Sequence, residues 1–79
     1  MAMGGKGILA AFGHVVRQAR RSQHLSQAQL ALSAGLNRNF VMSIEAGRRK
    51  PSIITIFALA KALGVSAAAL LSRTEKGLR

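Results

Sequence analysis

The side chains that could perform acid–base chemistry in this sequence are few and far apart. General acid–base catalysis needs positioned carboxylates, imidazoles or similar groups, and the 79 residues supply Glu45, Glu75, His14 and His24. The spacing of the two histidines matches no zinc-ligand motif, and neither has a Cys, an Asp or a second His within one helical turn. We therefore expect no enzyme activity, no metal centre and no cofactor.

Basic side chains dominate the charge. Lys and Arg number 12 against 2 Asp and Glu, which gives a formal net charge of +10. The hydrophobic share of 49% exceeds that of a disordered basic tail, so we expect one small folded domain. Such a domain needs an anionic partner, either nucleic acid or an acidic membrane surface. Cysteine is absent, which excludes disulfides and fits the cytoplasm, where we expect the protein to act.

A membrane span is one alternative for residues 53–71, which are nearly apolar and about as long as a bilayer crossing requires. Lys61 would lie near the centre of that span, at a cost of about 2.5–3.5 kcal/mol. Gly64, Val65 and Ser66 are better explained as a helix stop, a linker and a new N-cap. We therefore expect two short helices here and no membrane partner.

The pattern of the chain predicts an all-α fold of five short helices, because no long stretch alternates with a period of two. The expected segments are 8–23, 26–34, 37–47, 53–63 and 66–71. Ser26 and Gln29 form a capping box at the second segment, which Gly35 ends, and Asn37 caps the third.

The domain organisation follows from these segments. Residues 1–7 are predicted to form a flexible, Gly-rich lead, residues 8–72 the domain, and residues 73–79 a basic tail. In the fourth segment a set of apolar side chains is expected to be buried: Ile53, Ile56, Phe57, Leu59, Ala60 and Leu63.

Residues 27–46 predict a helix-turn-helix, two short helices joined at Gly35. Ala31 falls where the two helices approach most closely. The other apolar positions fall where two steeply crossed helices share a small core: Leu30, Ala34, Leu36, Val41 and Ile44. A generic helical hairpin is the alternative, but it does not require the basic surroundings.

The sequence resembles the Cro and phage-repressor type of helix-turn-helix regulator, the XRE family, over about residues 12–71. The resemblance rests on VVRQARRSQHLSQAQLA, AGLNR, SIEAGRRKPS and FALAKALGVSAAALL. It implies a compact five-helix, lambda-repressor-like domain that binds operator DNA as a dimer and regulates transcription. The stretch AGLNRNFVMSIEAGRRKPS is also similar to controllers of restriction-modification systems. A phage-type repressor, such a controller and the antitoxin of a toxin pair stay open as alternatives.

Residues 38–46 of the third segment form the expected recognition helix, whose N-terminal part enters the major groove. Arg38 suits guanine O6 and N7, Asn39 suits adenine, and Ser43 can bond to several bases. Met42 lies on the same outer side, and we expect Phe40 to pack against the domain. The alternative for Arg38 is a contact to phosphate alone.

Phosphate contacts are expected at two places beside this helix. Gln27 starts the second segment, where free N–H groups and the helix dipole attract anions. Arg48, Arg49 and Lys50 follow the recognition helix directly. Arg17, with Arg21, lies on the outer face of the first segment and is a weaker candidate.

Arg20 differs from the other arginines because it falls on the apolar stripe of the first helix, four residues after Val16. Glu45 stands four residues after Val41, at the inner edge of the recognition helix. An unpaired buried charge is costly. We therefore predict an ion pair between Arg20 and Glu45 that holds the recognition helix against the first helix.

A homodimer on a palindromic operator is expected, because one recognition helix covers only a few base pairs. The last segment carries the predicted interface: Val65, Ala68, Leu70 and Leu71. In the alternative, one of the two leucines closes the core of the monomer. No sensor domain fits in the chain, so we expect no small-molecule ligand. The rival function is a protein-interaction or membrane-surface module built on the same basic helices.

Overall fold

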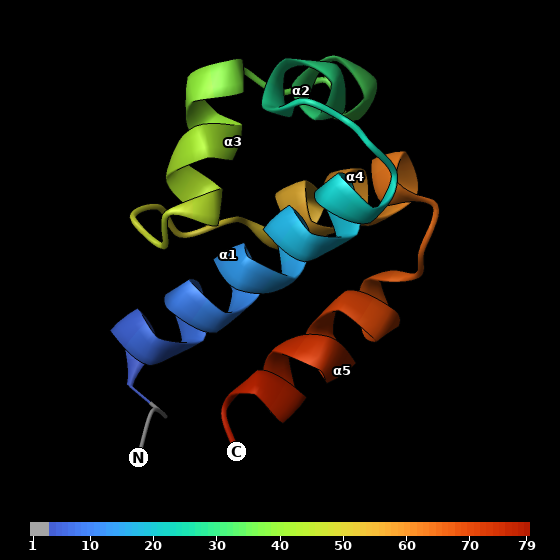
Figure 1. Ribbon diagram of the computed structural model, residues 1–79. Helices are drawn as coiled ribbons and strands as arrows, with labels where there is room; N and C mark the ends of the chain where they lie inside the picture. Colours follow the sequence, from blue (N-terminus) through green and yellow to red (C-terminus); the bar gives the residue numbers. More distant parts are fainter. Residues whose placement is uncertain (1–3) are drawn as a thin grey trace.

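Five α-helices account for nearly all of residues 4–79, the part of the chain that this computed structural model describes. The helices are α1 (Gly5–Ser22), α2 (Gln27–Ala34), α3 (Arg38–Glu45), α4 (Ile53–Leu63) and α5 (Ala67–Gly77). Residues 4–79 contain no strand, so the all-α prediction is confirmed. In Figure 1, α2 and α3 lie above α1, α4 lies behind it, and α5 runs antiparallel to α1 below it.

The helix ends follow the local sequence closely. Ser26 Oγ accepts from the Gln29 amide at 3.0 Å, and Gln29 Oε1 accepts from the Ser26 amide at 2.7 Å, which completes the predicted capping box. Asn37 Oδ1 accepts from the Asn39 amide at 2.7 Å and caps α3. Gly35 ends α2 in the left-handed conformation with φ 68°. The turn between α2 and α3 is therefore built by its own residues.

All five helices contribute to one apolar core. Its largest side chains with less than 2% exposure are Val16, Leu30, Val41, Ile44, Leu59, Leu63 and Leu70. Ala31 is 3% exposed, as its place at the α2 and α3 crossing requires. The short helices α2 and α3 contain only eight residues each, too few to be stable alone in water. Their stability comes from packing on α1 and α4.

The helices at both ends of the chain are longer than expected. Residues 5–7 of the predicted lead belong to α1. Residues 1–3 of the predicted lead lie outside the described part of the chain. Most of the predicted tail belongs to α5, where Thr74 is 5% exposed and donates to the Leu70 carbonyl at 2.8 Å. The two helices pack against one another, and Thr74 is the residue of the predicted tail that becomes buried, whereas most of its neighbours in residues 73–79 stay exposed.

The expected burial in α4 is wrong at two positions. Ile53 is 62% exposed and Phe57 is 60% exposed, whereas Leu59, Ala60 and Leu63 are buried. At 100° per residue, the two exposed side chains lie roughly 120–160° around the helix from Leu59. A helix that is apolar on every side cannot reveal from its sequence which side faces inward.

No single helix within residues 4–79 has the length and apolar character needed to cross a membrane. Taken together, α4 and α5 would satisfy that requirement, but they bend by 102° at their junction.

Candidate nucleic-acid interface

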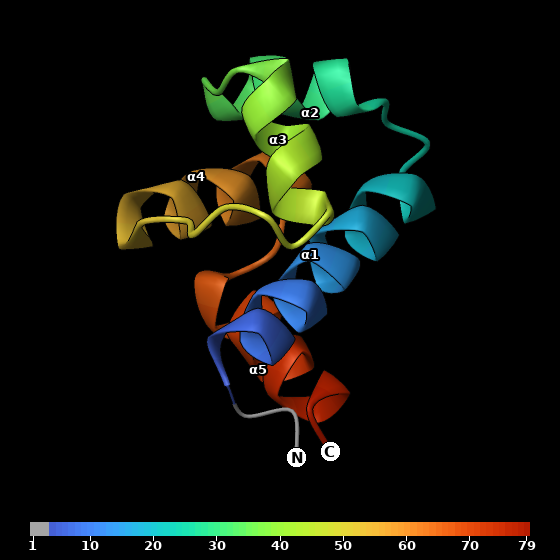
Figure 2. The same ribbon diagram turned by 90° about the vertical axis from the view of Figure 1, so that its left-hand side faces the viewer.

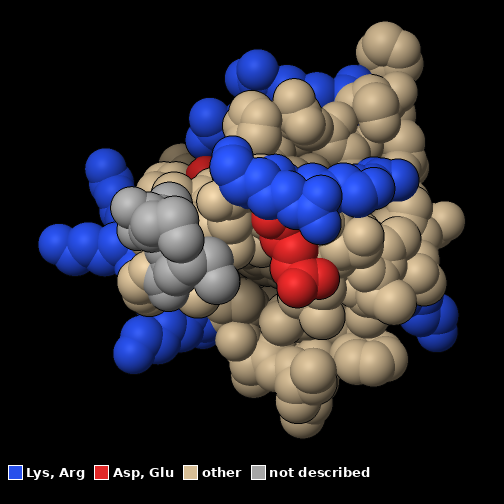
Figure 3. Space-filling model, turned by 90° about the horizontal axis from the view of Figure 1, so that it is seen from below, with Lys and Arg blue, Asp and Glu red and all other residues tan. Residues whose placement is uncertain are grey.

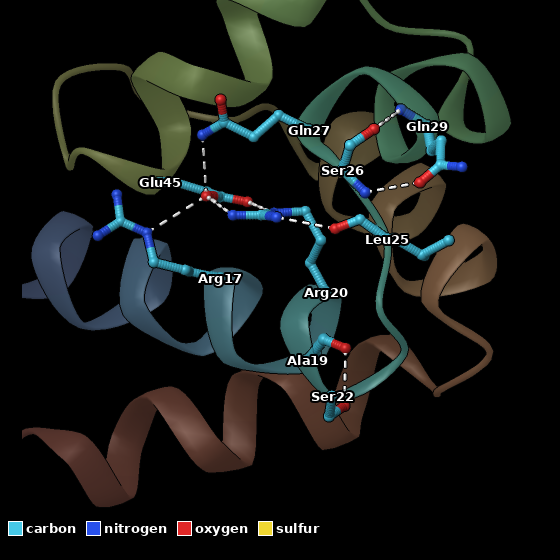
Figure 4. Close-up of polar contacts among 9 residues, drawn as sticks. All are labelled: Arg17, Ala19, Arg20, Ser22, Leu25, Ser26, Gln27, Gln29 and Glu45. Carbon is cyan, nitrogen blue, oxygen red and sulfur yellow. Dashed lines mark hydrogen bonds and ion pairs between the residues drawn. The ribbon is translucent and has the colours of Figure 1, made fainter.

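Glu45 is the centre of a buried polar cluster that joins α1, α2 and α3. Arg20 Nε donates to Glu45 Oε2 at 2.6 Å and Arg20 Nη2 donates to Oε1 at 2.9 Å, a two-pronged ion pair (Figure 4). Arg20 Nη1 also donates to the Leu25 carbonyl at 2.8 Å. The Glu45 side chain has no exposed surface and that of Arg20 is 10% exposed. The two side chains thus meet where the spacing of the sequence places them.

Two further donors complete the cluster. Gln27 Nε2 lies 3.1 Å and Arg17 Nε lies 3.3 Å from Glu45 Oε1 (Figure 4). Burial raises the pKa of Glu45, but the hydrogen bonds from Arg20 and Gln27 and the nearby cations outweigh burial and hold it below its ordinary value. The hydrogen bond to Glu45 raises the pKa of Arg20. Glu45 therefore stays ionised and ties the end of α3 to the start of α2.

Gly13 sets how closely α3 approaches α1, a role that the sequence pattern did not predict. A Cβ atom on Gly13 would clash with the Ile44 carbonyl oxygen and would lie 2.7 Å from that of Glu45. Only a residue without a side chain allows the last turn of α3 to rest on α1 at this distance. A glycine inside an amphipathic helix lowers the stability of the helix. Its presence at position 13 is therefore the sequence signal that another backbone approaches closely there.

The outer side of α3 presents the predicted base-reading residues to solvent. Arg38 and Asn39 are exposed, Met42 is 44% exposed, and Ser43 is half-buried. Figure 2 looks onto this helix and onto the loop that connects it to α4. The first turn of α3 therefore carries most of the accessible side chains, and Ser43 is the least accessible of the four.

A basic cleft lies beside the start of α2. Residues from three helices line it: Arg17, Arg20, Arg21, Ser26, Gln27, Ala28 and Arg38. Ser26 already accepts from the Gln29 amide, whereas the amides of Gln27 and Ala28 have no partner inside the helix, so positive charge and two free donors converge here. Arg17 and Arg21, the weaker candidates from the sequence, both line this cleft together with Arg38. The Gln27 side chain is engaged with Glu45, which leaves its backbone amide as the group for an anion.

The loop after α3 holds the three consecutive basic residues. Arg48, Arg49 and Lys50 are all exposed. The Arg49 guanidinium lies over the ring of Phe40, 5.1 Å from its centroid. Phe40 is half-buried and packs against the core, as expected. Arg49 is thus partly directed toward its own domain, whereas no such contact is seen for Arg48 or Lys50.

The predicted dimer residues, Val65 just before α5 and Ala68, Leu70 and Leu71 on it, divide into two groups. Leu70 has no exposed surface and belongs to the core of the monomer, so its assignment to an interface is wrong. Leu71 is 39% exposed, Ala68 is exposed and Val65 is half-buried. A different apolar surface is more prominent, formed by Ile53, Ile54 and Phe57 on α4, with exposures of 62%, 78% and 60%.

Comparisons with known proteins agree with this arrangement. A family model described as helix-turn-helix matches residues 16–70. The chain is 42% identical over 67 residues to the control protein C.BamHI of Bacillus amyloliquefaciens, covering 84% of this chain and 83% of that protein. An uncharacterised HTH-type transcriptional regulator of Sinorhizobium fredii is 39% identical over 57 residues, which are 72% of this chain and 74% of that protein.

Solved structures give the same result. The restriction-modification controller protein C.AhdI of Aeromonas hydrophila superposes with a TM-score of 0.77 at 39% identity, over 78% of this chain and 94% of that one. Other matched relatives are longer proteins, and the chain spans 44% of the length of two regulators of Mycobacterium tuberculosis.

Proposed function

Since the chain belongs to the XRE-type helix-turn-helix family, we propose that it is a transcriptional regulator that binds operator DNA as a dimer. The recognition helix is α3, which enters the major groove with its first turn. Arg38 and Asn39 bind base edges and Met42 contacts an apolar base surface. The less accessible Ser43 makes a further hydrogen bond to a base.

One observation carries this proposal: Arg38, at the exposed start of α3, lines the basic cleft at α2, and the exposed basic loop lies beside the other end of the same helix (Figure 2). The cleft suits one phosphate, held by Arg17, Arg21 and the first amides of α2. Arg48 and Lys50 suit phosphates on the other side of the helix. The cluster around Glu45 then fixes α3 relative to both sets of contacts.

The dimer, we propose, forms through the α4 surface of Ile53, Ile54 and Phe57. Two copies that each carry a charge of +10 repel one another over most of their surfaces. The helix has no charged residue before Lys61, so two copies can approach there without opposing charges. Ala68 and Leu71 stay as predicted contacts on α5.

No catalytic step forms part of this function. The buried Glu45 is occupied by its ion pairs, which supports this part of the proposal. The place of action is the cytoplasm, where operator DNA is found.

Among small regulators, the controller proteins of restriction-modification systems match most of this chain and most of their own length, which favours that type of regulator.

Titration with a labelled random-sequence duplex at rising salt tests the proposal, with anionic vesicles as the competing surface. Three phosphate contacts per protomer give six per dimer, so affinity falls by about 10³ between 50 and 200 mM salt. Tight binding to vesicles with weak, salt-insensitive binding to the duplex would refute it in favour of a membrane-surface module.

A further inference from the structure

An open groove between α1 and α5 takes no part in the interface described above. It measures about 900 Å³ and its floor is formed by small or apolar residues: Gly7, Ala10, Ala11, Val15, Ala19 and Gly77. Clefts that hold ligands measure about 300–1,000 Å³, so the groove is large enough for several side chains of a partner. In Figure 1, α5 lies on the opposite side of α1 from α3, so an occupant leaves the DNA-facing helix free.

The rim of the groove is basic. Arg73 and Lys76 of α5 line it, together with His14 and Gln18 of α1, and no acidic residue does. Glu75, the acidic residue of α5, is exposed but lies outside the lining. Figure 3 views the molecule from below, where a basic side chain crosses the middle of the face directly beside an acidic one and further basic side chains project at its edges. The groove thus combines an apolar floor with a positively charged edge.

We propose that this groove docks an acidic amphipathic helix of a partner protein. The apolar side of such a helix covers the floor, where Ala and Gly allow its backbone to approach closely, and its carboxylates face Arg73 and Lys76. A second copy of this chain fits poorly, because it brings a charge of +10 against a basic rim. Duplex DNA fits poorly too, because a phosphate backbone leaves the apolar floor uncovered. A regulator bound to its operator could in this way hold a second protein.

The probe for this proposal is a synthetic peptide of about 15 residues, roughly four helical turns. It carries Leu at i, i+3, i+4 and i+7 and Glu on its other faces, and a scrambled peptide has the same composition. Fluorescence anisotropy with the full chain should show binding of the patterned peptide and much weaker binding of the scrambled one. Comparable binding of the two peptides would mean attraction by net charge alone and would overturn the proposal.

Two exposed lysines provide a matched pair of variants. Lys76→Glu reverses a charge on the rim, and Lys61→Glu makes the same change on α4, outside the groove. We expect Lys76→Glu to weaken the peptide about tenfold and Lys61→Glu less than about twofold. Gln18→Trp should also weaken it, because the larger side chain fills the groove from an exposed position. Equal effects of the two lysine variants would contradict the proposal.

Three further readouts separate other occupants. Circular dichroism of each variant confirms folding. A single-stranded oligonucleotide that displaces the peptide, with the same loss on Lys76→Glu, would assign the groove to nucleic acid. A change of oligomeric state on Gln18→Trp would assign it to a second copy. Affinity for duplex DNA is measured in parallel and should be equal for the two lysine variants, so failure of the groove proposal leaves the DNA-binding proposal untouched.

Discussion

Replacing Gly13 by Ala tests how the recognition helix is positioned, because two physical effects oppose one another there. Ala is a better helix former than Gly, by about 1 kcal/mol in a helix interior. On that basis alone Gly13→Ala would stabilise α1. The added Cβ, however, clashes with the Ile44 carbonyl oxygen and lies 2.7 Å from that of Glu45, so the last turn of α3 must move away from α1.

Overpacking of a filled core costs about 1–3 kcal/mol. The upper part of that range applies, because both clashing atoms belong to the backbone and neither can rotate away. Subtracting the gain in helix propensity leaves a net loss of about 2 kcal/mol in the free energy of unfolding. For a domain of this size, that loss lowers Tm by about 8–16 °C.

Urea denaturation followed by circular dichroism measures the loss, and two other glycines are the controls. A Cβ on Gly5 meets no atom within 4 Å, and a Cβ on Gly77 lies 3.7 Å from the Ala11 Cβ, an ordinary contact. Gly5→Ala and Gly77→Ala should be neutral or slightly stabilising. Should Gly13→Ala raise stability as the controls do, the proposed contact between α1 and α3 is refuted.

Three other features of the molecule can be tested in the same way: the ion pair, the dimer surface and the basic loop. Glu45→Gln leaves Arg20 buried without its charge partner and should cost about 3 kcal/mol in urea denaturation; an unchanged free energy of unfolding would mean that the ion pair does not stabilise the fold. The pKa of Glu45 is lowered in the folded protein, so the stability that its charge contributes is present above the ordinary pKa of 4.5 and disappears as pH falls through the folded pKa. The free energy of unfolding of Glu45→Gln should therefore change less with pH in this acid range. The same pH dependence for Glu45→Gln and the parent protein would contradict this. Phe57→Lys places a charge on the α4 surface and should give a monomer in sedimentation, with the free energy of unfolding changed by less than about 0.5 kcal/mol. A stable dimer of this variant would contradict the α4 interface and favour one on α5. Arg48→Gln should reduce the slope of log DNA affinity against log salt concentration by about 0.9 for each phosphate that the protein no longer neutralises. Lys61→Gln should leave that slope unchanged. Equal slopes for the two variants would show that Arg48 does not contact phosphate.

Features decided by neighbouring residues could be predicted from the sequence. The capping box of Ser26 and Gln29 and the left-handed end at Gly35 depend on a few positions of the chain, and both occur as expected. The meeting of Arg20 with Glu45 was also predictable, although 25 residues separate them. Helical periodicity placed each on an inner face, and the cost of an unpaired buried charge supplied the reason to pair them.

Features decided by tertiary packing could not be predicted in this way. Ile53 and Phe57 lie on a helix whose other apolar side faces the core, and only the position of that core shows which side is outside. Gly13 depends on the carbonyl groups of α3, which are some 30 residues away in the chain. The length of α5 depends on its packing against α1, where a Cβ on Gly77 would lie 3.7 Å from the Ala11 Cβ. In the candidate site, residue types suggested Arg17 and Arg38 separately, and the fold brought them together in one cleft with Arg21.

Selection of bound duplexes from a random DNA pool tests most directly whether α3 reads an operator, because it reports base reading and dimer geometry together. We predict a palindromic motif with half-sites about 34 Å apart, centre to centre. We also predict that Arg38→Ala loses preference at one position in each half-site while keeping its affinity for random duplex. A pool without an enriched motif, or the same motif selected by Arg38→Ala, would contradict the claim that α3 reads the operator.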